Sequence, residues 1–239
     1  MPGSQTMHSQ AAAVHPEVHN PALLHHFAEP QQQRDAASLG MWIFLATEVM
    51  FFGGLFCAYL IYRIKYFGDF AAASQTLNAA LGAANTVVLI CSSLTVVLAV
   101  WAAQHARRTM LLVSLVLTII LGFAFLGIKA DEYKEKFELH HVPGASFQFQ
   151  KSIPGHPDQM ANPQHAQIYF ALYFIMTGLH ALHMIVGIGI FTWLLYSAWR
   201  GRFTPEYNTP MEIGGLYWHF VDIIWIYLFP LLYLIDLHK

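Results

Sequence analysis

Five long apolar runs separated by polar segments dominate the pattern of hydrophobic and polar positions along the chain. The runs cover residues 40–62, 80–103, 109–128, 168–196 and 214–236. An α-helix rises about 1.5 Å per residue, so about 20 apolar residues cross the hydrocarbon layer of a bilayer. Backbone exposed to lipid must satisfy its own hydrogen bonds, and no alternating barrel pattern is present. We therefore predict an all-α, polytopic membrane protein with five transmembrane helices.

Composition agrees with a membrane protein. Hydrophobic residues make up 56% of the 239 residues and charged residues only 11%, whereas about 25% of the residues of a soluble domain are charged. The 12 Lys and Arg nearly balance the 14 Asp and Glu, so the chain has no excess of positive charge that would indicate a nucleic-acid partner. Cys57 and Cys91 both lie inside apolar runs, where we expect them to be structural.

Two polar segments define the expected domain organisation. Residues 1–38 are rich in Gln, Ala, Pro and His and lack the apolar stretch of a signal peptide; we expect an irregular cytoplasmic tail that docks on a partner. Residues 39–239 form the expected five-helix domain, which contains a long polar loop at 129–167. Loops of that size usually serve function or interaction. We expect partner chains to order both segments.

Basic residues near the helix ends predict the orientation. The two short turns carry arginine pairs, Arg107 with Arg108 and Arg200 with Arg202, on the side expected for the N-terminus. Short loops rich in Lys and Arg remain in the cytoplasm, so the pairs favour a cytoplasmic N-terminus and a periplasmic C-terminus. A raw count of all basic residues favours the opposite orientation.

Glu48 lies near the middle of the first apolar run, in LATEVMFFGG. An ionisable side chain at that depth costs several kcal/mol if it is charged and exposed to lipid, so it should face protein. It could handle protons, act as a structural acid at a helix–helix contact, or be a neutral acid bonded to a neighbouring helix. The sequence leaves these three interpretations open.

Histidines and an acid recur at helical spacing in the last two runs. His180 and His183 are three residues apart in TGLHALH, as are His219 and Asp222 in YWHFVD; this spacing places each pair on one face of a helix. Di-iron bundles use Glu-x-x-His repeats with several carboxylates, and that repeat is absent here. Hydrogen bonding between helices is therefore favoured over metal binding.

Several of these segments together resemble the cytochrome c oxidase subunit III family, over about residues 35–237. They are LGMWIFLATEVMFFGGLF (39–56), NTVVLICSSLTVVLA (85–99), ADEY (130–133), TGLHALHMIVGIGI (177–190) and YWHFVDIIWIYLFPLLY (217–233). The resemblance is to the short bacterial form, which lacks the first two of the family's seven helices. The long 129–167 loop and the His-rich tail depart from the family pattern.

The resemblance implies roles for particular residues. Glu48 matches the buried intramembrane acid of the family, and no residue is implied to be catalytic, to hold a cofactor or to bind metal. The residues implied to form a structural polar network, or to contact lipid or a neighbouring subunit, are Glu132, Tyr133, His180, His183, Glu212, Trp218, His219 and Asp222.

The resemblance also implies a function. We expect the non-redox subunit III of a bacterial haem–copper terminal oxidase, a multi-pass protein of the cytoplasmic (inner) membrane. It would pack mainly on subunit I, with subunit II also in the complex, and would stabilise the enzyme and sustain proton uptake during cytochrome c oxidation and oxygen reduction. Haem and copper would lie in the partner subunits, and phospholipid would be bound. The chain itself would not be catalytic.

Two alternatives remain. The first is subunit III of a quinol oxidase, or the homologue associated with nitric oxide reductase. Subunit II, and not this chain, recognises the electron donor, so this sequence does not separate these possibilities. The second is an independent proton-coupled transporter that uses Glu48 as its carrier. Transporters commonly show internal repeats and helices broken near the midplane, whereas five helices do not divide into equal halves.

Overall fold

Six helices make up almost all of the computed structural model, which describes residues 29–144, 146–204 and 207–235. They are α1 (Pro30–Lys65), α2 (Phe67–Ser74), α3 (Ala79–Gln104), α4 (Arg108–Glu138), α5 (Pro163–Trp199) and α6 (Thr209–Tyr233). All but α2 are long and apolar enough to span a membrane. The predicted all-α fold with five transmembrane helices is therefore confirmed.

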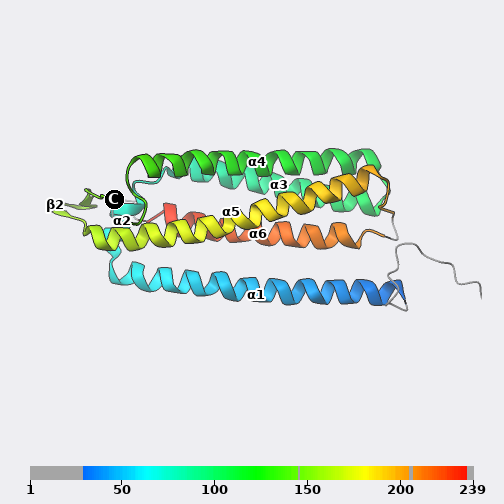
Figure 1. Ribbon diagram of the computed structural model, residues 1–239, viewed down its shortest axis with the longest axis horizontal. Helices are drawn as coiled ribbons and strands as arrows, with labels where there is room; N and C mark the ends of the chain where they lie inside the picture. The colour runs from blue at the N-terminus through cyan, green and yellow to red at the C-terminus, as the bar shows by residue number, and fades with distance from the viewer. Residues whose placement is uncertain (1–28, 145, 205–206, 236–239) are drawn as a thin grey trace, which may run out of the picture.

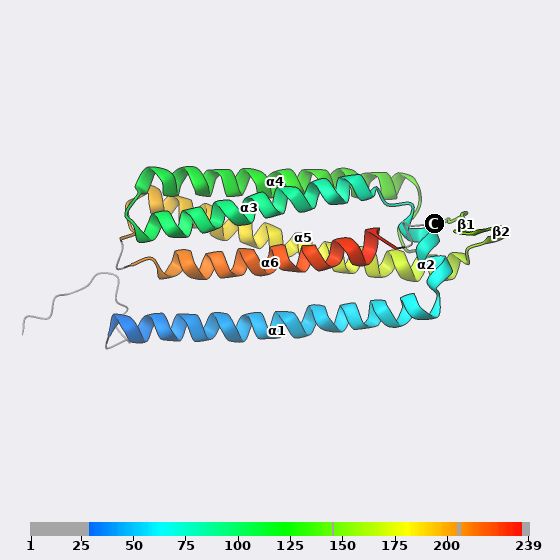
Figure 2. The same cartoon turned by 180° about the vertical axis from the view of Figure 1, so that it is seen from behind.

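The spanning helices run side by side along the long axis of the molecule (Figures 1 and 2). Helices α3, α4, α5 and α6 form a four-helix bundle in which α3 packs on α4 and α6, and α5 packs on the same two. Helix α1 lies outside this bundle, against α5 and α6. Only 17% of the most apolar window of α1 is buried, against 56% for α6, so most of the α1 surface is left to lipid or a partner.

The helices extend further than the apolar runs. Helix α1 begins at Pro30, so residues 30–38 are helical where an irregular tail was expected. Proline is favoured at the first position of a helix, and the Gln, Arg and Ala residues that follow are good helix formers. Residues 1–28 of the tail lie outside the described part of the chain.

The expected 129–167 loop is shorter in the structure and packs on its own chain. Helix α4 continues to Glu138, and the connection to α5 contains a small antiparallel pair, β1 (Ser152–Ile153) and β2 (His156–Met160). Phe149 is buried, and the His141 ring stacks on Phe170 of α5 with 4.9 Å between centroids. Contacts within the chain therefore position this connection, at the end of the bundle opposite the α3–α4 turn (Figure 1).

Candidate functional site

Glu48 faces α5 from α1, at the margin of the bundle. Its Oε2 lies 3.3 Å from Nε2 of His183, and the two side chains are 20% and 17% exposed. The His183 ring also packs against Phe52 of α1, with 5.5 Å between centroids. The contact thus joins the loosely packed helix α1 to the bundle through a polar pair at mid-helix.

A hydrogen bond of His183 fixes which ring nitrogen faces Glu48. Nδ1 lies 2.8 Å from the carbonyl oxygen of Leu179. A carbonyl oxygen can only accept, so Nδ1 carries the proton and a neutral ring presents the lone pair of Nε2 to Glu48. Oε2 of Glu48 lies 3.3 Å from this nitrogen, but within the described residues it has no hydrogen-bond partner.

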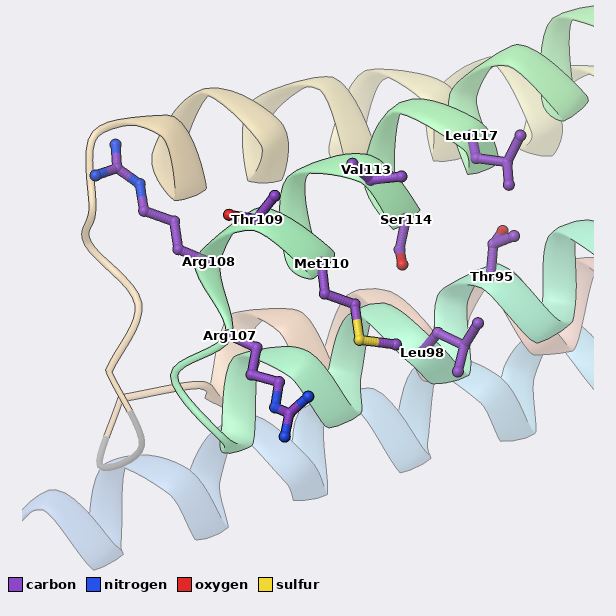
Figure 3. A pocket seen from close by; sticks show the side chains of 9 residues that line it. All are labelled: Thr95, Leu98, Arg107, Arg108, Thr109, Met110, Val113, Ser114 and Leu117. Carbon is purple, nitrogen blue, oxygen red and sulfur yellow. The ribbon is translucent and has the colours of Figure 1, made fainter.

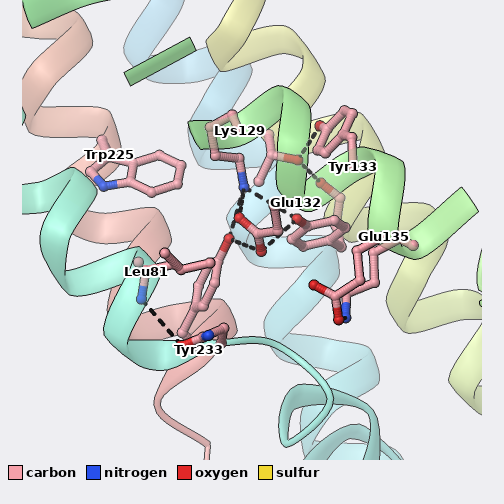
Figure 4. A network of polar contacts seen from close by, with 12 residues as sticks. Leu81, Lys129, Glu132, Tyr133, Glu135, Trp225 and Tyr233 are labelled. Carbon is pink, nitrogen blue, oxygen red and sulfur yellow. Dashed lines mark hydrogen bonds and ion pairs between the residues drawn. The ribbon is translucent and has the colours of Figure 1, made fainter. Parts of the chain in front are cut away.

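A second polar network lies inside the bundle, where α4, α5 and α6 meet (Figure 4). Lys129, which is 4% exposed, donates to Oε2 of Glu132 at 2.8 Å and to the hydroxyls of Tyr173 at 3.1 Å and Tyr233 at 2.8 Å. Both tyrosines donate to Oε1 of Glu132, at 3.0 and 2.6 Å. All three ammonium protons are used and the carboxylate accepts three bonds, which is the condition under which a buried ion pair is tolerated.

Tyr133 extends this arrangement toward α5. Its hydroxyl lies 2.5 Å from Oγ1 of Thr177, and Thr177 donates to the carbonyl of Tyr173 at 2.6 Å. Since the Thr177 proton is already committed, Tyr133 donates to Thr177. The polar residues Glu132 and Tyr133 therefore tie α4 to α5 and α6.

His180 and His183 contact different helices although they are three residues apart. His180 is buried against Phe125 of α4 and Trp225 of α6, at 5.3 and 5.2 Å between ring centroids. Within the described residues neither of its ring nitrogens has a hydrogen-bond partner. At 3.6 residues per turn, positions three apart differ by about 60° around the axis. That angle directs His180 into the bundle and His183 toward α1.

The face between α3 and α6 holds the remaining expected residues. Nδ1 of His219 lies 2.6 Å from Oγ of Ser93, and the Trp218 indole donates to Oγ of Ser92 at 3.0 Å. Asp222 is buried, and its carboxylate interacts with the side chain of Ser93. Glu212 accepts from Gln104 at 2.8 Å near the α3–α4 turn.

The structure distributes the expected residues over several separate places. In the described part of the chain, no group of three His, Cys, Asp or Glu could hold a metal ion. Sequence reasoning missed Lys129, Tyr173 and Tyr233, which complete the buried network. The spacing of Lys129 and Glu132, three residues apart, was a usable signal, but Lys129 was assigned to a loop.

Five spanning helices joined by buried polar contacts define a polytopic helical membrane protein. A model of the family described as cytochrome c oxidase subunit III matches residues 24–154 and 163–236. The chain therefore belongs to the cytochrome c oxidase subunit III family. It is a subunit III of an oxidase complex, an oxidoreductase, and the family carries no redox cofactor in this subunit.

Curated relatives from distant organisms show the same likeness. The chain is 32% identical over 198 residues to "Probable cytochrome c oxidase subunit 3" of Nocardia farcinica, covering 83% of this chain and 87% of the relative. It is 30% identical over 203 residues to "Probable quinol oxidase subunit 3" of Staphylococcus haemolyticus, covering 83% and 89%. It is 30% identical over 200 residues to "Cytochrome c oxidase subunit 3" of Gallus gallus, covering 81% and 67%.

Proposed function

We propose that this chain serves a bacterial haem–copper terminal oxidase by packing on subunit I, stabilising the complex and sustaining proton uptake during cytochrome c oxidation and oxygen reduction. The Glu48–His183 pair carries the proposal. It places an acid next to an imidazole at the edge of the bundle, beside a helix whose surface is mostly left to lipid or a partner. Haem and copper belong to the partner subunits, and phospholipid completes the surface.

The proposal includes the placement of the chain in the cytoplasmic membrane, with its N-terminus in the cytoplasm and its C-terminus in the periplasm. Its support is that the start of α1, the α3–α4 turn with Arg107 and Arg108, and the α5–α6 turn with Arg200 and Arg202 share one end of the molecule (Figure 1). Basic residues in short turns favour the cytoplasmic side.

Purification of the tagged chain from its native membrane tests the proposal. We expect haem absorption and copper in stoichiometric amounts in the intact complex, and neither after the folded chain is separated from its partners. Recovery of the chain alone or as a homo-oligomer without haem would support the independent transporter and end the proposal.

A quinol oxidase is the second candidate, because a relative of similar identity and coverage is named a quinol oxidase subunit. Oxygen consumption by the purified complex separates the two. Activity with reduced cytochrome c, and a dicopper centre in the co-purifying subunit II, favour the first; activity with quinol alone favours the second.

A further inference from the structure

Helix α3 borders two open grooves on the surface of the chain. Among the described residues that line the groove between α3 and α4, only Arg107 and Arg108 are charged, and both lie at the turn (Figure 3). The groove between α3 and α6 has a volume of about 450 Å³. Its lining runs from the Gln104–Glu212 pair near the turn to His219. The second groove therefore places an acid and an imidazole, which both exchange protons, along one path.

Behind His219, a serine connects the imidazole ring to a buried acid. Nδ1 of His219 lies 2.6 Å from Oγ of Ser93 on α3. Asp222 lies one turn further along α6, is 3% exposed, and interacts with the same serine side chain. Ser93 therefore bridges a histidine that lines the groove and a carboxyl group that lies inside the bundle.

The surroundings of Asp222 differ from those of a fixed structural acid. Glu132 accepts from Lys129 and from two tyrosines, whereas within the described residues no Lys, Arg or His forms an ion pair with Asp222. A buried carboxylate without a cation is costly. Acids inside a membrane bundle often mark proton pathways, and chains of acids and histidines form proton relays in pumps and transporters.

The order of the three groups allows a proton to pass between Asp222 and the groove. When Asp222 is protonated, it donates to Ser93, Ser93 donates to Nδ1 of His219, and Nε2 of the neutral ring carries the hydrogen. When Nε2 loses its proton to the groove, the Ser93 proton moves to Nδ1 and the Asp222 proton moves to Ser93. Both hydrogen bonds reverse, one proton leaves, and the negative charge appears on Asp222.

The groove supplies the route from His219 to the end of the molecule. From Glu212 to His219, α6 advances by seven residues, or about 10 Å at the rise of an α-helix. The volume of about 450 Å³ is much larger than the ~30 Å³ that a water molecule occupies. Water in the groove can therefore connect Nε2 of His219 with Glu212, near the α3–α4 turn.

We propose that Asp222, Ser93 and His219 form a proton relay that exchanges protons with the α3–α4 end of the molecule through the groove between α3 and α6. The relay goes beyond the proposed function, in which Glu48 and His183 are the acid and the imidazole of interest, and it does not depend on the oxidase role. A fixed hydrogen-bonded contact between α3 and α6 is the competing interpretation, and it requires no proton movement.

Infrared spectroscopy on the resting complex tests the relay. The complex is transferred from H2O to D2O, and the carbonyl stretch of protonated carboxyl groups is followed as it shifts on deuteration. The band that disappears in Asp222→Asn belongs to Asp222. Loss of a positioned proton-transfer group typically costs about a hundredfold, so we expect its deuteration to slow by about that factor in Ser93→Ala and in His219→Gln. Ser93→Thr keeps the hydroxyl and should exchange at the original rate.

Added imidazole separates a relay from a fixed contact. It should enter the open groove and restore exchange in His219→Gln but not in Ser93→Ala, whose missing hydroxyl lies beyond the ring. Ser92→Ala is the matched control, because it removes the neighbouring hydroxyl of α3, which bonds to Trp218, and should leave the exchange rate unchanged.

Three results would each overturn the inference: an unaltered carboxyl spectrum in Asp222→Asn, unchanged exchange in both Ser93→Ala and His219→Gln, or an equal slowing in Ser92→Ala. Haem content is measured on the same samples. A failure of the proposed oxidase role is thereby seen separately from a failure of the relay, because the exchange is measured without oxygen reduction.

Discussion

At the scale of single residues, polar groups are used in two different ways. Lys129 and Glu132 have complete hydrogen-bonding shells inside the bundle, which suits a fixed structural contact. Glu48 and His183 share one contact at its margin. The second pair has the simpler surroundings, so substitution there separates a structural role from a proton-carrying role.

Replacement of Glu48 by Gln or Ala gives the first prediction. The Gln amide can still donate to Nε2 of His183 but carries no titratable proton, whereas Ala leaves the ring nitrogen unpaired at a cost of about 1–3 kcal/mol. We expect Gln to leave assembly and oxygen consumption near normal and Ala to loosen the subunit, measured by subunit retention and oxygen uptake. Equal loss of proton pumping in both variants, with full retention, would instead assign Glu48 to proton transfer.

At the scale of elements, close packing of α4, α5 and α6 depends on glycines opposite Trp218. The fully buried indole of Trp218 lies between Gly122 of α4 and Gly187 of α5, where an added Cβ would be 3.0 and 3.1 Å from ring atoms. A rigid ring held from both sides cannot move away from either one. The absence of two side chains therefore allows the three helices to approach.

Substitution of Gly187 by Ala tests this packing. We expect a loss of about 1–3 kcal/mol from overpacking, larger than the gain of up to about 1 kcal/mol in helix propensity, seen as a lower thermal midpoint. Gly189→Ala is the matched control, because nothing lies within 4 Å of its added Cβ. Equal midpoints for the two variants would show that the helices adjust without cost.

The connection between α4 and α5 gives a pH-dependent prediction. Burial, and then the nearby charge of Lys136, lower the pKa of His141, which stacks on Phe170. The folded connection therefore favours the neutral ring, while an opened one binds a proton more readily near the ordinary pKa of about 6.5. Stability due to this group is complete above that pH and declines as the pH falls below it.

Hydrogen exchange across residues 139–162 measures the effect. After correction for intrinsic exchange, we expect protection to decrease between pH 7.5 and pH 5.5, and to decrease much less in His141→Leu, which keeps an apolar group against Phe170. The same decrease in both proteins would assign the pH response to another group.

At the scale of the whole molecule, α1 differs from the bundle. It packs on α5 and α6 alone among the long helices, and large apolar side chains such as Trp42, Val49 and Met50 are exposed along it. Family membership places the chain in an oxidase complex. Helix α1 is therefore the element whose stability depends most on its surroundings.

Hydrogen exchange on the separated chain and on the complex compares these elements. Because few buried contacts hold α1, we expect its amides to exchange faster in the separated chain than in the complex, while α6 changes little. Equal protection of α1 in both states would mean that the bundle alone fixes it.

The sequence by itself determined the five spanning helices and the family. Both depend on local features: the length of each apolar run, set by bilayer thickness, and short motifs such as TGLHALH and YWHFVD. It also singled out Glu48, because an acid within an apolar run is visible without knowledge of its neighbours. The extra turns of α1 and α4 were missed because polar residues can continue a helix beyond the membrane.

Only the tertiary structure decided which polar groups meet. Lys129 contacts Tyr233, 104 positions away, and Glu48 contacts His183 on another helix; helical periodicity gives the face of a residue but not the helix that it faces. The same limit hid the different surroundings of His180 and His183. Pairing between distant segments depends on how all the helices pack at once, and no local pattern contains that information.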